Sequence, residues 1–415
     1  MRKLYTLFLL IVSVSVSTFG DVVQIDINGT TREYIIVAPE TPSESPRPLI
    51  VFLHGLGQRI SDYVEIAQQT ANTTGAVMLL PQALDEQNPS IKFLNEVLSS
   101  LEIPEFPESG IPVSSVWNAG TSIPLTGLLT PEQMGMLQAF FPEIAAAQKI
   151  VLNADVDDIG FINRIINDIK VPYNIRQSRI YMFGVSMGGA MTYKYAYSEN
   201  AQTAAIAVVS GFIGAEVYHG KILNTPVCIF HSEDDEVVPY YGGIFSQSIP
   251  YTVAEFIQKY KCTEIGYPEG LPDIANDGIS VQVQTYACDP RKALKFYLLS
   301  KAKHADFMVS DYKTGPNDID YLTEIWKFFE ETKSNKIEEI FASNTISFFY
   351  PNPAKEAISF SVSGKYELKE ITGKAILTGN VAAGEIVSIG NIPAGLYLVT
   401  LKSIEGNYTD KLIIK

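Results

Sequence analysis

The chain is poor in cysteine, histidine and basic residues. Of its 415 residues only three are cysteine and four are histidine, and the formal net charge is −15. Three cysteines without short paired spacings predict no zinc or other metal site. Nucleic acid and anionic membranes both require clustered Lys and Arg, so we expect neither as a partner. The few histidines leave a short list of candidates for a general base.

Apolar and aromatic residues are abundant. The chain is 46% hydrophobic and holds 22 Tyr and 21 Phe, which is enough to fill a large core and excludes global disorder. The length predicts two or three domains.

The first twenty residues have the pattern of a secretory signal peptide. Met1-Arg2-Lys3 is basic, residues 4–16 are almost wholly apolar, and small residues lead to Gly20. The apolar stretch is too short to span a bilayer comfortably, and no other segment is long and apolar enough. We therefore predict a signal peptide over residues 1–20, a secreted protein and no integral membrane segment.

An exported chain permits a disulfide. Cys228 lies in the apolar run 227–230 and is expected to be a buried strand residue. Cys262 and Cys288 lie in loop-like sequence and are the pair that could form a disulfide.

Apolar runs alternate with helical patterns over residues 21–330, which we predict to be one domain. Two β-rich runs around Asn28-Gly29 predict a hairpin. Strands alternating with helices imply a mainly parallel sheet covered on both faces. The expected buried strands are 48–53, 76–80, 180–183, 205–209, 227–230 and 294–299, and the clearest helices are 157–170 and 319–329.

Three segments depart from this alternation. Residues 84–155 are rich in Pro, Ser and Glu, and an insertion of that length predicts a lid or rim. Residues 331–347 are polar and predict a linker. Residues 348–415 consist of short β-like runs with glycine turns, which predict a small all-β sandwich.

The segment 179–190 carries the main chemical signal. An apolar run breaks into Gly184-x-Ser186-x-Gly188 and continues into a helical pattern. This is the pattern of a nucleophile elbow, in which a tight strand-to-helix turn exposes the serine Oγ. The glycines are needed because side chains there would collide with the neighbouring strand and helix. With the sheet, the elbow predicts an α/β-hydrolase with Ser186 as nucleophile.

A serine hydroxyl needs a base, and the base needs an acid to orient it. In this fold the order along the chain is Ser, then Asp or Glu, then His. His304 follows the last apolar run and is the expected base. The run after His231 supplies the acid, but spacing alone leaves Glu233, Asp234, Asp235 and Glu236 open.

Acyl transfer also needs two backbone N–H groups aimed at the developing oxyanion. We assign one to Met187, the residue after the nucleophile. The other should come from the loop 54–57, where we select Leu56. His54 precedes the nucleophile in the sequence and is expected to brace this loop.

Several segments between residues 45 and 310 together resemble the secreted esterase family of polyhydroxybutyrate depolymerases, feruloyl esterases and acetylxylan esterases. They are Leu53-His54-Gly55, Trp117-Asn118-Ala119-Gly120, residues 156–162, the elbow, and residues 231–243. The resemblance implies Asp235 as the triad acid and a disulfide between Cys262 and Cys288, and we assign Trp117 to substrate binding. It implies no metal or organic cofactor.

The last domain resembles the C-terminal sorting domain of the bacterial type IX secretion system. The likeness rests on Tyr350-Pro351-Asn352-Pro353, on residues 392–399 and on the terminal Lys411-Leu412-Ile413-Ile414-Lys415. It implies export across the outer membrane of a Bacteroidetes-type bacterium through the secretion machinery, with the domain removed or kept as an anchor. The alternative is a carbohydrate-binding or other β module.

The sequence thus predicts a secreted serine carboxylic-ester hydrolase acting through an acyl-enzyme on a polymeric ester. Feruloyl or acetyl esters of plant polysaccharides are the first expectation, and polyhydroxybutyrate or another polyester is the alternative. Ala302-Lys303 before the catalytic histidine and Asp306-Phe307 after it depart from the family pattern and leave the substrate open. A prolyl-oligopeptidase-type peptidase and a non-catalytic binding protein rank lower.

Overall fold

The computed structural model consists of two compact units, Met1–Lys333 and Ser334–Lys415. The residues that it describes are 20–87, 91, 114–126, 130–140, 142–217, 225–243, 246–264, 267–288, 292–307, 318–332, 348–370, 374–403 and 406–415. The expected signal peptide, except Gly20, and most of the expected linker lie outside these residues. Glu331 and Thr332 of that linker are instead the end of a helix.

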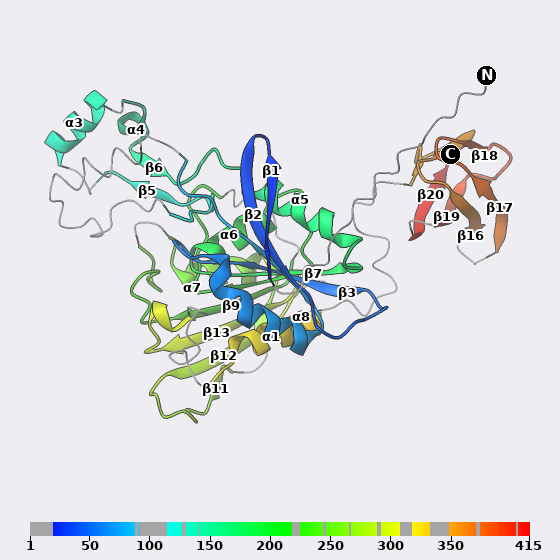
Figure 1. Ribbon diagram of the computed structural model, residues 1–415. Coiled ribbons are helices and arrows are strands. Elements are labelled where there is room, and N and C mark those ends of the chain that lie inside the picture. Colours follow the sequence, from blue (N-terminus) through cyan, green and yellow to red (C-terminus); the bar gives the residue numbers. More distant parts are fainter. Residues whose placement is uncertain are drawn as a thin grey trace, which may run out of the picture. The chain divides into compact units, whose positions relative to one another are not determined.

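The first unit is built on one mixed sheet (Figure 1). The strand order is β1-β2-β4-β3-β7-β8-β9-β13-β12-β10, and β11 pairs with β12. The six strands from β4 to β13 in this order run parallel, and the outer strands pair antiparallel. The mainly parallel sheet predicted from the sequence is therefore confirmed. The strands are β1 (Val22–Ile27), β2 (Thr30–Val37), β3 (Arg47–Leu53), β4 (Val77–Pro81), β7 (Ile175–Val185), β8 (Ala205–Val209), β9 (Val227–Ser232), β10 (Thr263–Glu264), β11 (Glu269–Leu271), β12 (Ser280–Ala287) and β13 (Leu294–Ser300).

Helices cover both faces of this sheet, which explains why its central strands are continuous apolar runs. In β3, Leu49 and Val51 belong to one apolar core, while Ile50 and Phe52 belong to the other. The first core includes side chains from α5 (Asp158–Lys170), α6 (Met187–Ala196) and α7 (Ile249–Tyr260). The second includes side chains from α1 (Val64–Thr74) and α8 (Tyr321–Thr332).

Local signals set the helix ends. Asp157 caps α5, since its Oδ1 accepts a hydrogen bond from the Gly160 amide at 2.8 Å. Asp320 does the same for α8 by accepting from the amides of Leu322 and Thr323. Both predicted helices therefore begin one or two residues later than the sequence pattern suggested, because the acid is a cap and not a helical residue.

The described part of the 84–155 insertion adds a separate two-stranded sheet, and its buried apolar side chains belong to the first core. The strands β5 (Ser122–Pro124) and β6 (Lys149–Val151) pair antiparallel outside the main sheet. Two short helices, α3 (Pro131–Phe140) and α4 (Pro142–Ala147), lie between these strands in the sequence. No helix in the described part of the chain is long and apolar enough to cross a membrane.

The second unit contains two antiparallel sheets, β14-β15-β18 and β17-β16-β19-β20, which share one apolar core. This is the small β-sandwich arrangement expected from the sequence. Its strands are β14 (Phe349–Tyr350), β15 (Ala357–Phe360), β16 (Gly364–Glu370), β17 (Ala375–Val381), β18 (Ile386–Ser388), β19 (Gly395–Ser403) and β20 (Gly406–Ile414).

Candidate active site

Ser186 occupies a sharp turn between the end of β7 and the start of α6. Its backbone has φ 55° and ψ −121°, a strained conformation for a residue with a side chain. The flanking glycines allow the turn: a Cβ at Gly188 would lie 2.0 Å from the Leu53 carbonyl oxygen, and one at Gly184 would lie 2.2 Å from the Gly188 carbonyl oxygen. The collisions anticipated from the sequence are thus with the β3 backbone and the first turn of α6.

The Ser186 hydroxyl contacts His304, which contacts Asp235. The Oγ atom of Ser186 lies 2.9 Å from Nε2 of His304, and Nδ1 of His304 lies 2.9 Å from both carboxylate oxygens of Asp235. His304 begins a short 3-10 helix, His304–Phe307, just after β13. All three side chains are largely buried, with Ser186 7% exposed. This geometry lets a proton pass from the serine to the ring while the carboxylate holds the other ring nitrogen.

Asp235 is held in its charged form. Burial alone would raise the pKa of this carboxyl, but His304, Ser210 and the Val238 amide bind it, and the net effect is a lowered pKa. Its Oδ1 accepts hydrogen bonds from the amides of Val237 and Val238 at 3.0 and 2.8 Å. The carboxylate is therefore fixed by its own loop.

Two neighbouring acids hold the histidine loop. Asp234 accepts a hydrogen bond from the Lys301 amide at 2.6 Å, and Glu236 accepts one from the His304 amide at 3.3 Å. Lys301 has φ 68°, so the loop turns sharply there. Among the four acids that spacing left open, Asp235 alone contacts the His304 ring in the structure, and these two neighbours bind backbone.

His231, the other histidine that follows the nucleophile, lies behind the acid and not beside Ser186. It is fully buried, and its Nε2 donates to the Val238 carbonyl oxygen at 2.9 Å. Burial lowers its pKa, so the ring is neutral.

Ser210, which the sequence analysis did not select, also belongs to this network. It follows β8, is fully buried, and its Oγ donates to Oδ2 of Asp235 in a short contact. The same Oγ lies 3.0 Å from Nδ1 of His304. A lone serine has no characteristic spacing to other catalytic residues. The signal that could have identified Ser210 is its position directly after β8, the strand between β7 and β9.

The loop after β3 lies against the nucleophile. A Cβ at Gly55 would lie 3.5 Å from Cβ of Ser186. The Gly55 amide donates to the Gln58 side chain at 2.7 Å, so it is not free. Within the described residues the amides of Leu56 and Met187 have no hydrogen-bond partner, which leaves both able to donate to a substrate oxygen.

The buried His54 ring holds the loop after β3 in place. Its Nδ1 donates to the Gly55 carbonyl oxygen at 2.7 Å, and its Nε2 accepts from the Ala83 amide at 3.1 Å and from Gln82 Nε2 at 3.0 Å. Burial lowers the pKa of His54 to about 4. A neutral, fully buried ring is a brace and not a base, as the sequence order indicated.

Trp117 was expected from the sequence to bind substrate, but its side chain lies in the interior. The side chain is fully buried, its Nε1 donates to the His54 carbonyl oxygen at 2.9 Å, and its ring packs on the His54 ring at 5.1 Å between centroids. A side chain with no exposed surface cannot contact substrate. The assignment of Trp117 to substrate binding is therefore wrong, and the residue supports the loop that carries Leu56.

The structure joins Cys262 and Cys288 in a disulfide and leaves Cys228 buried and free in β9. The bond links the end of α7 to the end of β12.

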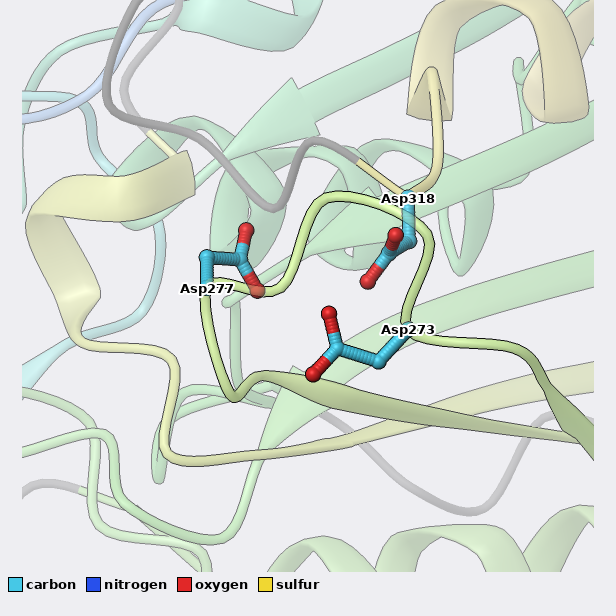
Figure 2. A group of neighbouring side chains, drawn as sticks. All are labelled: Asp273, Asp277 and Asp318. Carbon is cyan, nitrogen blue, oxygen red and sulfur yellow. The ribbon is translucent and has the colours of Figure 1, made fainter.

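One group of acids could offer oxygen ligands to a cation. Figure 2 shows Asp273 and Asp277, from the loop before β12, facing Asp318, and ligand oxygens of the three lie within 4.8 Å of one another. The Oδ1 atom of Asp318 also accepts from the Ala275 amide at 2.7 Å. Two of the three residues are exposed, and exposed acids gather in this way without an ion, so we assign no metal to them.

Comparisons with known proteins match both units. Residues 131–279 match the family model described as phospholipase/carboxylesterase, and residues 348–415 match the one described as secretion system C-terminal sorting domain. Residues 131–279 are therefore similar to phospholipases and carboxylesterases, and residues 348–415 are similar to a secretion sorting domain. The sorting domain implies export to the cell surface or beyond.

Individual relatives are esterases by name. The chain is 36% identical over 182 residues to the bifunctional acetylxylan esterase/xylanase XynS20E of Neocallimastix patriciarum, covering 42% of this chain and 23% of that protein. It is 29% identical over 121 residues to feruloyl esterase C of Emericella nidulans, covering 28% and 41%. The chain thus spans less than half the length of these relatives. Among solved structures, an acetyl xylan esterase from Aspergillus awamori aligns with a TM-score of 0.41 and 13% identity, over 75% of this chain and 99% of that one.

Proposed function

We propose that the protein is a secreted serine carboxylic-ester hydrolase that acts through an acyl-enzyme. The observation that carries this proposal is the 2.9 Å contact between Ser186 Oγ and His304 Nε2, made by a serine in a strained elbow. His304 takes the serine proton as Oγ attacks the ester carbonyl and returns it to the leaving alcohol. Water then attacks the acyl-enzyme with His304 as base. Asp235 holds the ring and stabilises its charged form.

The amides of Leu56 and Met187 would bind the oxyanion that forms in both steps. Each has no other partner within the described residues, and they flank the nucleophile on the β3 loop and the α6 terminus. The buried His54 and Trp117 keep the first of these loops in place. Two donors fixed before the reaction stabilise charge without a reorganisation cost.

We further propose that the acyl group is ferulate or acetate carried by plant polysaccharide. The support is the set of relatives named feruloyl esterase and acetylxylan esterase, together with a sorting domain that places the enzyme where polymeric substrates occur.

The test uses the full secreted chain beside its Ser186→Ala variant. A fluorophosphonate probe reports whether Ser186 is a nucleophile, and methyl ferulate, acetylated xylan and polyhydroxybutyrate film report the substrate. Serine-dependent labelling with release of ferulate or acetate supports the proposal, whereas erosion of the film alone would move the substrate to a polyester. Equal labelling and hydrolysis by the alanine variant would exclude the catalytic role of Ser186.

A further inference from the structure

We propose that Ser210 is a fourth member of the catalytic network, a positioning residue whose hydroxyl fixes and partly neutralises the Asp235 carboxylate. The inference rests on the proposed function for its catalytic meaning, but the contacts on which it depends lie in the structure itself. Ser210 is fully buried, and its hydroxyl touches both Asp235 and His304.

The two oxygens of the Asp235 carboxylate have unequal partners. Oδ1 accepts from the amides of Val237 and Val238 and from His304. Within the described residues, the hydrogen-bond partners of Oδ2 are His304 and the Ser210 hydroxyl. Without the Ser210 hydroxyl, Oδ2 would keep His304 as its one hydrogen-bond partner among the described residues, and the carboxylate would carry more uncompensated charge toward the ring.

The backbone of Ser210 is strained in the conformation that places its hydroxyl beside Asp235. Its φ of 48° lies in the left-handed region that non-glycine residues avoid, and its amide donates to the Phe230 carbonyl oxygen at 2.8 Å. The next residue, Gly211, packs so closely that a Cβ there would lie 2.9 Å from Cα of Gly189 on α6. A glycine at 210 would adopt this conformation without strain, so the serine hydroxyl is held beside Asp235 at a conformational cost.

Other charged or titratable groups surround the same site and must be kept constant in any test. Glu236 accepts a hydrogen bond from the His304 amide. Asp234 accepts from the Lys301 amide through its side chain and from Lys303 Nζ through its carbonyl oxygen. Asp306 accepts from the Lys303 amide. From β9, Nε2 of His231 lies 3.8 Å from Oδ2 of Asp235. None of these groups is changed by a substitution at Ser210.

The test compares Ser210→Gly and Ser210→Ala with a matched control, Ser232→Ala. The glycine variant removes the hydroxyl and the backbone strain together, whereas the alanine variant removes the hydroxyl alone, so an effect common to both variants is due to the hydroxyl. Ser232 is an equally buried serine at the end of the adjacent strand, but its Oγ accepts from the Asp234 amide and touches neither His304 nor Asp235.

Two readouts separate this role from packing. The first is the downfield NMR resonance of the proton between His304 Nδ1 and Asp235, which needs no substrate and should move in both Ser210 variants. The second is the acid limb of the kcat/KM profile for 4-nitrophenyl acetate, which should shift upward by about 0.5 to 1 pH unit because the less compensated carboxylate holds the ring proton more tightly. We also expect kcat to fall about tenfold.

The two outcomes are distinguishable. Shifts in both Ser210 variants and none in Ser232→Ala support the role, and a moved NMR resonance supports it even where no ester is cleaved and the proposed function has failed. A resonance that stays at its wild-type position in both Ser210 variants would overturn it, whatever the activity.

Discussion

Acidification should destabilise the hydrolase unit through His54. In the folded protein the ring is fully buried, and burial lowers its pKa to about 4. Its Nε2 already accepts from the Ala83 amide and from Gln82, so a proton on that nitrogen would face two donors. In the unfolded chain the same ring has a pKa of about 6.5.

The sign follows from proton uptake. Between about pH 6.5 and 4 the unfolded chain binds more protons than the folded one, so the free energy of unfolding falls as the pH drops through this window. A separation of about 2.5 units corresponds to about 3.4 kcal/mol, of which roughly 2.5 kcal/mol is lost by pH 4.5. His231 and Asp235, whose pKa values are also lowered, act in the same direction, so a variant is needed to isolate His54.

Tryptophan fluorescence provides the assay, because both tryptophans, Trp117 and Trp326, belong to the first unit. Urea unfolding of the wild type and of His54→Gln would be followed at pH values of about 7 and 4.5. The variant lacks the titrating ring, so its stability deficit relative to the wild type should shrink by roughly 2.5 kcal/mol at the lower pH. A deficit of the same size at both pH values would refute the assignment of His54 as a buried neutral brace.

Three further predictions concern the acid, the elbow and the disulfide. Asp235→Asn should lower kcat by about 10³- to 10⁴-fold with little change in KM, and steady-state hydrolysis within tenfold of wild type would contradict its role. Gly188→Ala would place a methyl group 2.0 Å from a backbone oxygen, so it should abolish probe labelling of Ser186, whereas Gly135→Ala, with open space around the added methyl, should leave labelling intact. Cys262→Ser opens a bond between residues 26 apart and should lower the free energy of unfolding by about 3.5 kcal/mol; an unchanged urea midpoint would contradict this.

The secondary-structure elements that could be predicted from the sequence are those with a clear local pattern of apolar residues. Buried parallel strands are continuous apolar runs, so β3, β8, β9 and β13 could be located within one or two residues. The helix α7 could also have been found, because Ser248 caps it and a proline follows within its first turn. The strand β12 is not among the expected strands, because its alternation of buried and exposed residues gives no continuous apolar run.

The burial of Trp117 and the conformation of the acid loop could not be predicted from the sequence. Trp117 lies in a short polar segment, and nothing in its neighbours indicates that the side chain turns inward to the His54 carbonyl oxygen. The choice among four successive acids depends on how one loop folds back on the amides of Val237 and Val238. Spacing along the chain does not encode that fold, so the acid could be selected only through a family resemblance.

The order of the strands explains why a fourth residue belongs to the network. The strands β7, β8, β9 and β13 are consecutive neighbours and run parallel, so their carboxyl ends lie along one edge of the sheet. Each is followed by one member of the network: the nucleophile after β7, Ser210 after β8, the acid loop after β9 and the base after β13. Because the nucleophile and the acid follow strands that are two positions apart, the residue that ends the intervening strand necessarily lies between them. A small donor there binds the carboxylate, whereas an apolar side chain would leave Oδ2 of Asp235 with the His304 ring as its one hydrogen-bond partner among the described residues.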